Sequence, residues 1–236
     1  MRKKIVFDIE CVGIDFETLD PVAQHSLLRY AKTDEAQQDE KERLALYPVT
    51  GFIVGIGMLN PDTNKGKMLY LVDKDYDKGQ SYNGEILYVP CTTEKALLTA
   101  FWEDVVQYDQ IISFNGRGFD APYIIIRSMV HDLVMCKDLM PNRYGDYRTG
   151  FNAHLDLADQ LSFYGAMRRF SLHLFTTAMG ITSPKQKGDD GDVIDGLAVQ
   201  RLFAQKQFDV IADYCMRDVV ATAELYRRWT RTMGES

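Results

Sequence analysis

A buried strand that ends in two carboxylates constrains this chain of 236 residues more than any other feature. Ile5, Val6 and Phe7 form an apolar run, which predicts a strand over 3–10. Asp8 and Glu10 lie two residues apart at its end, so both side chains point to the same face. Paired carboxylates on an apolar strand repel each other and lose hydration unless a cation lies between them. The pattern predicts either a site for a hard divalent cation or a strand end that emerges into water.

A third acid, Asp120, follows a second short apolar strand, which we expect over 110–114. Asn115 comes directly after this strand, and a glycine-rich bend with Phe119 leads into a helix that begins at Asp120. Aspartate at a helix start is commonly an N-cap, which is the structural alternative for this acid. Asparagine can hydrogen-bond a sugar or a base, and an aromatic ring can stack on a base. The loop is therefore a candidate substrate contact.

A fourth acid lies in the last long helix, in the sequence Tyr214-Cys-Met-Arg-Asp218. Tyr214 and Asp218 are four residues apart and so share one helix face. Taken alone, the same pattern fits a surface helix with a half-buried tyrosine and a solvated aspartate.

The remaining hydrophobic pattern predicts an α/β fold, a mixed sheet flanked by helices with a helix-rich C-terminal half. We expect one domain over 1–236, with a charged helical excursion at about 20–47. A hairpin is expected from 52–59 and 67–72, and loops are expected at 143–150 and 185–192. Helices are expected over 93–108, 120–133, 157–164, 171–179, 193–203 and 208–229.

Charge and cysteine content limit the classes of function. A net charge of −7 argues against a broad, sequence-independent duplex binder, but not against an enzyme that grips a few nucleotides in a narrow cleft. The four cysteines are scattered without zinc-ligand spacing, so free thiols are expected. Apolar stretches are too short for a membrane span or a secretory signal. We therefore expect a cytoplasmic protein without a membrane partner.

Together the three acidic motifs resemble the DEDD superfamily of 3′–5′ exonucleases (DnaQ-like), in the branch with tyrosine in its third motif. D-I-E-C resembles the first motif of the proofreading domains of family-B DNA polymerases. FNGRGFDAPY, HLDLADQLSFYGA and DGLAVQRLFAQKQFDVIADYCMRDVVATAELYRRW resemble stand-alone bacterial exonucleases related to that domain. The resemblance covers roughly the whole chain and is weakest over 15–50 and 74–92. A Pro-Gly-Lys-like element of that group reads Ser-Pro-Lys-Gln-Lys-Gly at 183–188 here.

The resemblance implies a ribonuclease H-like fold with two divalent metal ions, Mg²⁺ or Mn²⁺. Asp8 would bind both ions, Glu10 and Asp218 would complete one site, and Asp120 would serve the other, partly through water. Tyr214 has an ordinary pKa near 10 and is a poor base at neutral pH, so we expect it to orient the attacking water.

The expected substrate contacts lie near these acids. Val12 and Gly13 would meet the terminal sugar through backbone groups, as the resemblance suggests. Asn115 and Phe119 would hold and wedge the last nucleotides, and Lys185 would contact a phosphate. Weaker candidates, each with a structural alternative as a cap, a buried histidine or a solvated loop cation, are Asp156, His154, Lys187 and Arg117.

The resulting hypothesis is a metal-dependent 3′–5′ exonuclease that hydrolyses single-stranded nucleic acid to mononucleotides. The alternatives are an inactive ribonuclease H-like module that binds nucleic acid, and a metal-dependent phosphoesterase acting on small nucleotides. A preference for DNA or RNA, protein partners, the oligomeric state and the role of 20–47 are not indicated by any motif.

Overall fold

A computed structural model describes residues 2–182 and 196–233. Within them, seven strands form one mixed sheet in the order β4-β5-β3-β2-β1-β6-β7. Their bounds are Lys4–Gly13 (β1), Gly51–Leu59 (β2), Gly66–Leu71 (β3), Ser81–Asn83 (β4), Ile86–Cys91 (β5), Gln110–Ser113 (β6) and His154–Asp156 (β7). The predicted α/β fold with a mixed sheet is confirmed, and its topology is consistent with a ribonuclease H-like fold.

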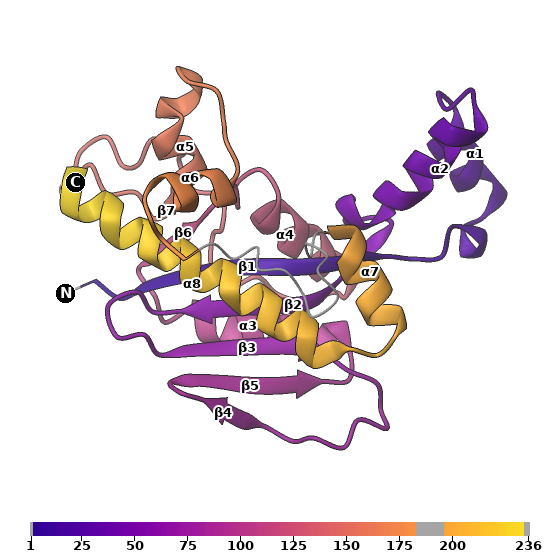
Figure 1. The fold of residues 1–236 in the computed structure, drawn as a ribbon, viewed down its shortest axis with the longest axis horizontal. Coiled ribbons are helices and arrows are strands. Elements are labelled where there is room, and N and C mark those ends of the chain that lie inside the picture. Colours follow the sequence, from indigo (N-terminus) through magenta and orange to yellow (C-terminus); the bar gives the residue numbers. More distant parts are fainter. Residues whose placement is uncertain (1, 183–195, 234–236) are drawn as a thin grey trace.

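Helices cover both faces of this sheet, with α8 in front of it and α3 behind it in Figure 1. The helices are Pro21–Leu28 (α1), Asp34–Glu42 (α2), Glu94–Val105 (α3), Asp120–Val130 (α4), Leu157–Leu161 (α5), Leu172–Ala178 (α6), Gly196–Ala204 (α7) and Phe208–Met233 (α8). Short 3-10 turns follow Asp15 (η1, Phe16–Thr18), Glu42 (η2, Arg43–Leu46) and Ser162 (η3, Phe163–Gly165). None of the helices in the described ranges is both long and apolar enough to cross a membrane.

Successive side chains of the central strand β1 point to opposite faces of the sheet. Ile5, Phe7 and Ile9 pack into the core between the sheet and helices α3 and α4. Val6 packs on the other face, in the core that contains much of α8. Asp8 and Glu10 have the same parity as Val6, so the pleat directs them toward the face that α8 covers.

Strand β2 lets α8 lie close to the sheet beside these acids. Gly57 is the cross-strand neighbour of Asp8. A Cβ atom on Gly57 would lie 2.8 Å from Cγ2 of Val219 and 3.1 Å from Sδ of Met216, both on α8. A bulkier residue would therefore push α8 away, because packed interiors leave no room for an added methyl group.

The excursion at 20–47 contains α1, α2 and the turn η2. Helices α1 and α2 contain no buried residue and project from the rest of the molecule in Figure 1. Its base is held by the buried side chains of Phe16 and Leu44. The charged composition of this segment and the helical spacing of its leucines predict helices without saying how they pack.

The structure also corrects and completes the predicted elements. The hairpin of β2 and β3 was predicted, whereas β4, β5 and β7 were not. The helix predicted over 157–164 ends at Leu161, because Phe163 and Tyr164 have left-handed φ angles of 48° and 55°. The loop expected at 185–192, and with it Lys185, lies outside the described residues.

Candidate active site

Two carboxylates and one thiol meet where β1 passes under α8. The candidate ligand atoms of Asp8, Glu10 and Cys215 all lie within 4.8 Å of one another. Burial raises the pKa of the Cys215 thiol well above its ordinary value, and its sulfur contacts the Asp8 carbonyl oxygen at 3.6 Å. A protonated thiol is a poor ligand for a hard cation, so within this group of three the carboxylates of Asp8 and Glu10 are the suitable ligands.

Asp120 joins the cluster from the start of α4. Strand β6 pairs with β1 only as far as Val6. Beyond Val6, the backbone N–H and C=O groups on that edge of β1 therefore need other hydrogen-bond partners. The carboxylate of Asp120 accepts a hydrogen bond from the backbone N–H of Ile9 at 3.0 Å. This bond fixes Asp120, which is 4% exposed, beside the strand that carries Asp8 and Glu10.

Helix α8 completes the cluster with Tyr214 and Asp218, one turn apart. The buried Tyr214 side chain belongs to a third core cluster, which includes Val12, Val54 and part of α7. Burial raises the pKa of Tyr214 above its usual value, and the carboxylates of Asp218, Glu10 and Asp8 raise it further, as does a hydrogen bond with Asp218. The phenol therefore remains protonated at neutral pH and can donate a hydrogen bond.

The acids of this cluster destabilise one another's charged forms. Burial raises the pKa of Asp8 well above its usual range, and the charges of Asp120, Asp218 and Glu10 add to the effect. The pKa of Glu10 is raised by burial and by Asp218 and Asp120, and burial raises that of Asp120 to about 7. Four mutually repelling carboxylates with oxygen donors only are a donor set that fits Mg²⁺ or Mn²⁺.

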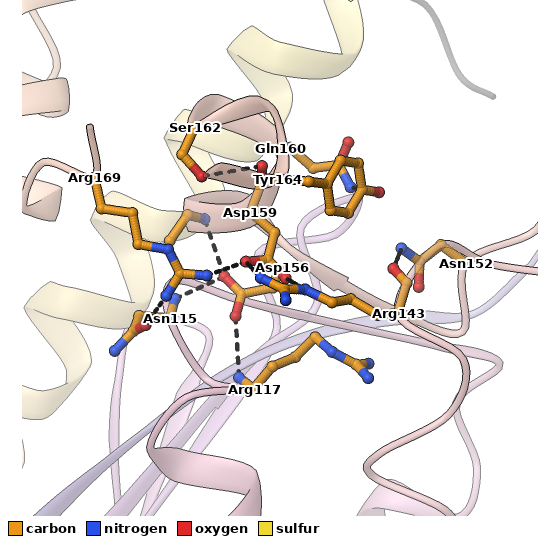
Figure 2. Close-up of polar contacts among 11 residues, drawn as sticks. Asn115, Arg117, Arg143, Asn152, Asp156, Asp159, Gln160, Ser162, Tyr164 and Arg169 are labelled. Carbon is orange, nitrogen blue, oxygen red and sulfur yellow. Dashed lines mark hydrogen bonds and ion pairs between the residues drawn. The ribbon is translucent and has the colours of Figure 1, made fainter. Parts of the chain in front are cut away.

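Asp156 fixes the loop between β6 and α4. It is 1% exposed and accepts hydrogen bonds from the backbone N–H groups of Asn115 (2.7 Å), Arg117 (3.0 Å) and Ala158 (2.9 Å). Figure 2 shows its carboxylate below Asp159 of α5, with dashed lines to Asn115 and Arg117. Asp156 is thus a helix cap, as its position before α5 suggested, and also a clamp on the Asn115 loop.

The side chain of Asn115 is held as well. Its backbone is left-handed, with φ of 64°, a conformation that asparagine tolerates better than most residues. Its amide oxygen accepts a hydrogen bond from Nη1 of Arg169 at 3.0 Å. The amide nitrogen is the end left for a ligand, and a ligand atom meeting it must be an acceptor.

The other predicted substrate contacts have different surroundings. The Val12 side chain is buried among apolar residues. The N–H and C=O groups of Gly13 bond the Gln200 side chain, at 2.7 and 3.1 Å. Phe119 is partly buried, with its ring 5.3 Å from that of Tyr123. Arg117 donates from Nη2 to the Pro141 carbonyl oxygen at 2.6 Å.

The motifs gave no indication of several residues that support this site. Gln200 reaches Gly13 across 187 positions of sequence, and Arg169 reaches Asn115 across 54. The one usable signal was Asp159, which is a charged residue inside the largely apolar run 155–161 and is buried in the structure. His154, for which a structural role is the simpler expectation, is buried and bonds Ser113 and the Leu139 carbonyl oxygen.

Comparison with known proteins gives a consistent match. Residues 73–235 match the family described as "Predicted 3′-5′ exonuclease related to the exonuclease domain of PolB". The chain is 27% identical over 161 residues to the catalytic subunit of DNA polymerase epsilon from Saccharomyces cerevisiae, which covers 66% of this chain and 7% of that protein. It is 23% identical over 231 residues to DNA polymerase 1 of Sulfurisphaera ohwakuensis, covering 92% of this chain and 22% of that protein. The chain thus spans only a small part of the polymerases that it matches.

Proposed function

This chain belongs to the family of 3′–5′ exonucleases related to the exonuclease domain of PolB, and from that membership we propose that it shortens single-stranded nucleic acid from its 3′ end to mononucleotides. The observation that carries the proposal is the convergence of Asp8, Glu10, Asp120 and Asp218 beside Tyr214. This acid set resembles that of the DEDD superfamily, and the position of Tyr214 beside Asp218 favours its tyrosine branch.

The four carboxylates would hold two divalent ions, Mg²⁺ or Mn²⁺. Such ions, when bound, make a water molecule acidic enough to act as a nucleophile and neutralise charge on the attacked phosphate. The carboxylates themselves keep the donor set rigid, because the hydrogen bond from Ile9 N–H and the packing of α8 fix where they point.

Tyr214 would act as a hydrogen-bond donor and not as a base. Its pKa lies above that of a free tyrosine because the site is buried and acidic, so the hydroxyl keeps its proton at neutral pH. A protonated hydroxyl beside Asp218 can orient the attacking water and hold it against the phosphate.

Further residues would bind the terminal nucleotides. The amide nitrogen of Asn115 would donate to a phosphate or base oxygen, because its amide oxygen already accepts from Arg169. Phe119 would wedge the last bases apart. Val12 and Gly13 would meet the terminal sugar at the end of β1, where the sugar would have to displace the Gln200 side chain from the backbone groups of Gly13. Lys185 would contact a phosphate.

A buried acid cluster favours a free single strand as the substrate. Glu10 is 9% exposed and Asp120 is 4% exposed, which favours a thin, extended strand over a duplex as the chain that reaches both acids. The bases of a frayed 3′ end are already unpaired. Such an end can therefore enter as an extended chain without the energetic cost of unpairing a duplex.

The test is a cleavage assay with 5′-labelled DNA and RNA strands of about 20 nucleotides, longer than a typical single-strand site. The protein, Asp8→Ala and a matched control, Asp75→Asn, are compared in Mg²⁺, Mn²⁺ and EDTA. Asp75 is a suitable control because its side chain is 82% exposed and lies in the connection between β3 and β4. We expect a metal-dependent ladder that shortens from the 3′ end and is lost only in Asp8→Ala.

Other outcomes would support the alternatives. Binding without cleavage would indicate an inactive nucleic-acid-binding module. Neither binding nor cleavage of strands, with hydrolysis of a small phosphoester such as a nucleoside monophosphate, would indicate a phosphoesterase.

A further inference from the structure

A group of arginine and tyrosine side chains lies next to the Asn115 loop, outside the acid cluster. Arg143 and Tyr144 come from the loop before β7, and Tyr164 and Arg169 come from the segment between α5 and α6. We call these four residues the arginine–tyrosine surface.

One buried carboxylate holds both arginines of this surface. Asp159 accepts from Nε and Nη2 of Arg143 at 2.7 and 2.5 Å, and also pairs with Nη2 of Arg169. Figure 2 shows Asp159 between the two guanidinium groups. The Asp159 side chain is 2% exposed, whereas those of Arg143 and Arg169 are 41% and 44% exposed. The ion pairs with Asp159 therefore hold both guanidinium groups in fixed positions, where they remain partly exposed to solvent.

The two tyrosines form an exposed aromatic pair beside these charges. The ring centroids of Tyr144 and Tyr164 are 4.9 Å apart, and the two rings are tilted by 48°. Gln160 donates from its amide to the Tyr164 hydroxyl at 2.7 Å, which fixes that ring further. The pair therefore offers an ordered aromatic face to solvent.

The backbone at Phe163 and Tyr164 adopts an unfavourable conformation at the protein surface. Phe163 and Tyr164 both have left-handed φ angles, 48° and 55°, followed by Gly165 at 96°. Bulky residues are unfavourable in this region, and both side chains stay exposed, so burial does not compensate for the strain. Strain of this kind concentrates at ligand-binding sites, where a bound partner uses the conformation.

The surface is continuous with the candidate active site. Arg169 bonds the amide oxygen of Asn115, and the Asn115 loop ends at Asp120, one of the clustered acids. The charges on this side also differ from those of the whole chain, which has a net charge of −7. Over 140–171, which is described throughout, the charged side chains that are not buried are Arg143, Arg148, Arg168, Arg169 and Asp146.

We propose that the arginine–tyrosine surface binds the single strand upstream of its 3′-terminal nucleotides. Bases stack on the Tyr144 and Tyr164 rings, and the guanidinium groups of Arg143 and Arg169 contact the phosphates that join them. Stacking and phosphate contacts tolerate any sequence and either sugar. The proposal rests on the exonuclease function proposed above and adds where the strand runs before it reaches the acids.

The test removes the rings and leaves the buried Asp159 ion pairs intact. In Tyr144→Ala/Tyr164→Asn, asparagine is chosen because it tolerates the left-handed backbone at position 164. Tyr144→Phe/Tyr164→Phe keeps both rings and removes only the hydroxyls. Tyr82→Ala is the matched control, since Tyr82 is 74% exposed on β4, at the opposite edge of the sheet from β7. Thermal unfolding shows that each variant is folded.

Binding is measured by fluorescence anisotropy with oligothymidylate and oligouridylate of about 20 nucleotides, in EDTA so that no strand is cut. We expect the Kd of the ring-deleted variant to rise about tenfold, which corresponds to about 1.4 kcal/mol, or one stacked base. The ring-preserving variant and Tyr82→Ala should bind like the wild type. In Mg²⁺, the KM for the long strand should rise while the KM for a trinucleotide, which is too short to reach the surface, should not.

Two results would overturn the proposal: a Kd in the ring-deleted variant within about twofold of the wild type, or an equal rise of KM for the trinucleotide. A wild-type protein that binds neither oligonucleotide would overturn it as well. Failure of the proposed exonuclease function is a separate result. It would appear as no cleavage by the wild type in Mg²⁺, whereas the anisotropy measurement would still compare the binding of the variants.

Discussion

Asp156 offers the sharpest test of how this fold holds the Asn115 loop. Its carboxylate is buried and accepts three backbone N–H groups, two from the Asn115 loop and one at the start of α5. Asp156→Ala removes both acceptor oxygens and with them all three hydrogen bonds. Hydrogen bonds to charged groups contribute about 1.5–3 kcal/mol each, and a helix cap about 1 kcal/mol. Removal also relieves the repulsion with Asp120 and Asp159 that raises carboxylate pKa values here, which offsets part of the loss.

We therefore expect Asp156→Ala to lower the free energy of unfolding by about 3–5 kcal/mol. Asp156→Asn should lower it less, by about 1–2 kcal/mol. Oδ1 accepts from Asn115 and Ala158 and Oδ2 from Arg117, so an asparagine that keeps its oxygen at Oδ1 loses only the Arg117 bond. The amide nitrogen of the introduced asparagine then faces the backbone N–H of Arg117, so two donors meet without an acceptor between them.

Urea unfolding of the two variants, compared at equal m-values, measures these differences. Asp20→Ala is the control, because Asp20 caps α1 with two exposed hydrogen bonds and its loss should cost at most about 1 kcal/mol. In the cleavage assay, Asp156→Ala should lose activity at temperatures where it is still folded, because Asn115 is no longer held. An Asn variant as unstable as the Ala variant, or an Ala variant that loses less than about 1 kcal/mol, would refute the clamp.

Three further perturbations follow from the same structure. Gly57→Ala should destabilise the protein by about 1–3 kcal/mol and reduce activity, because its Cβ would meet Val219 at 2.8 Å and displace α8; unchanged urea midpoints would contradict this packing. Burial lowers the pKa of His154 to about 4, so between this value and its ordinary 6.5 the unfolded chain binds a proton that the folded chain does not. Stability should therefore fall by about 2 kcal/mol from pH 7 to pH 5 through this group, and urea unfolding of His154→Gln should show a correspondingly smaller loss. Mg²⁺ at about 100 times its Kd should stabilise the wild type by about 2.7 kcal/mol. Asp8→Asn should raise the Tm in EDTA by relieving repulsion and should abolish the Mg²⁺-dependent rise; a rise that survives the substitution would place the ions elsewhere.

The sequence by itself determined the features that depend on local periodicity. Alternation along β1 placed Asp8 and Glu10 on one face, and helical spacing placed Tyr214 and Asp218 on one face of α8. Both patterns are properties of a single element and do not require knowledge of its neighbours. Their resemblance to known exonuclease motifs then grouped the acids, which lie far apart in the chain, into one expected site.

The tertiary structure decided which elements meet and what holds them. The bond from Ile9 to Asp120, the Gln200 clamp on Gly13 and the pairing of Arg143 and Arg169 on Asp159 join residues whose local sequence does not identify the partner. The short strands β4 and β7, of three residues each, exist because a neighbouring strand supplies their hydrogen bonds. Local sequence sets the direction of a side chain, but the partner of a buried polar group depends on how distant segments pack.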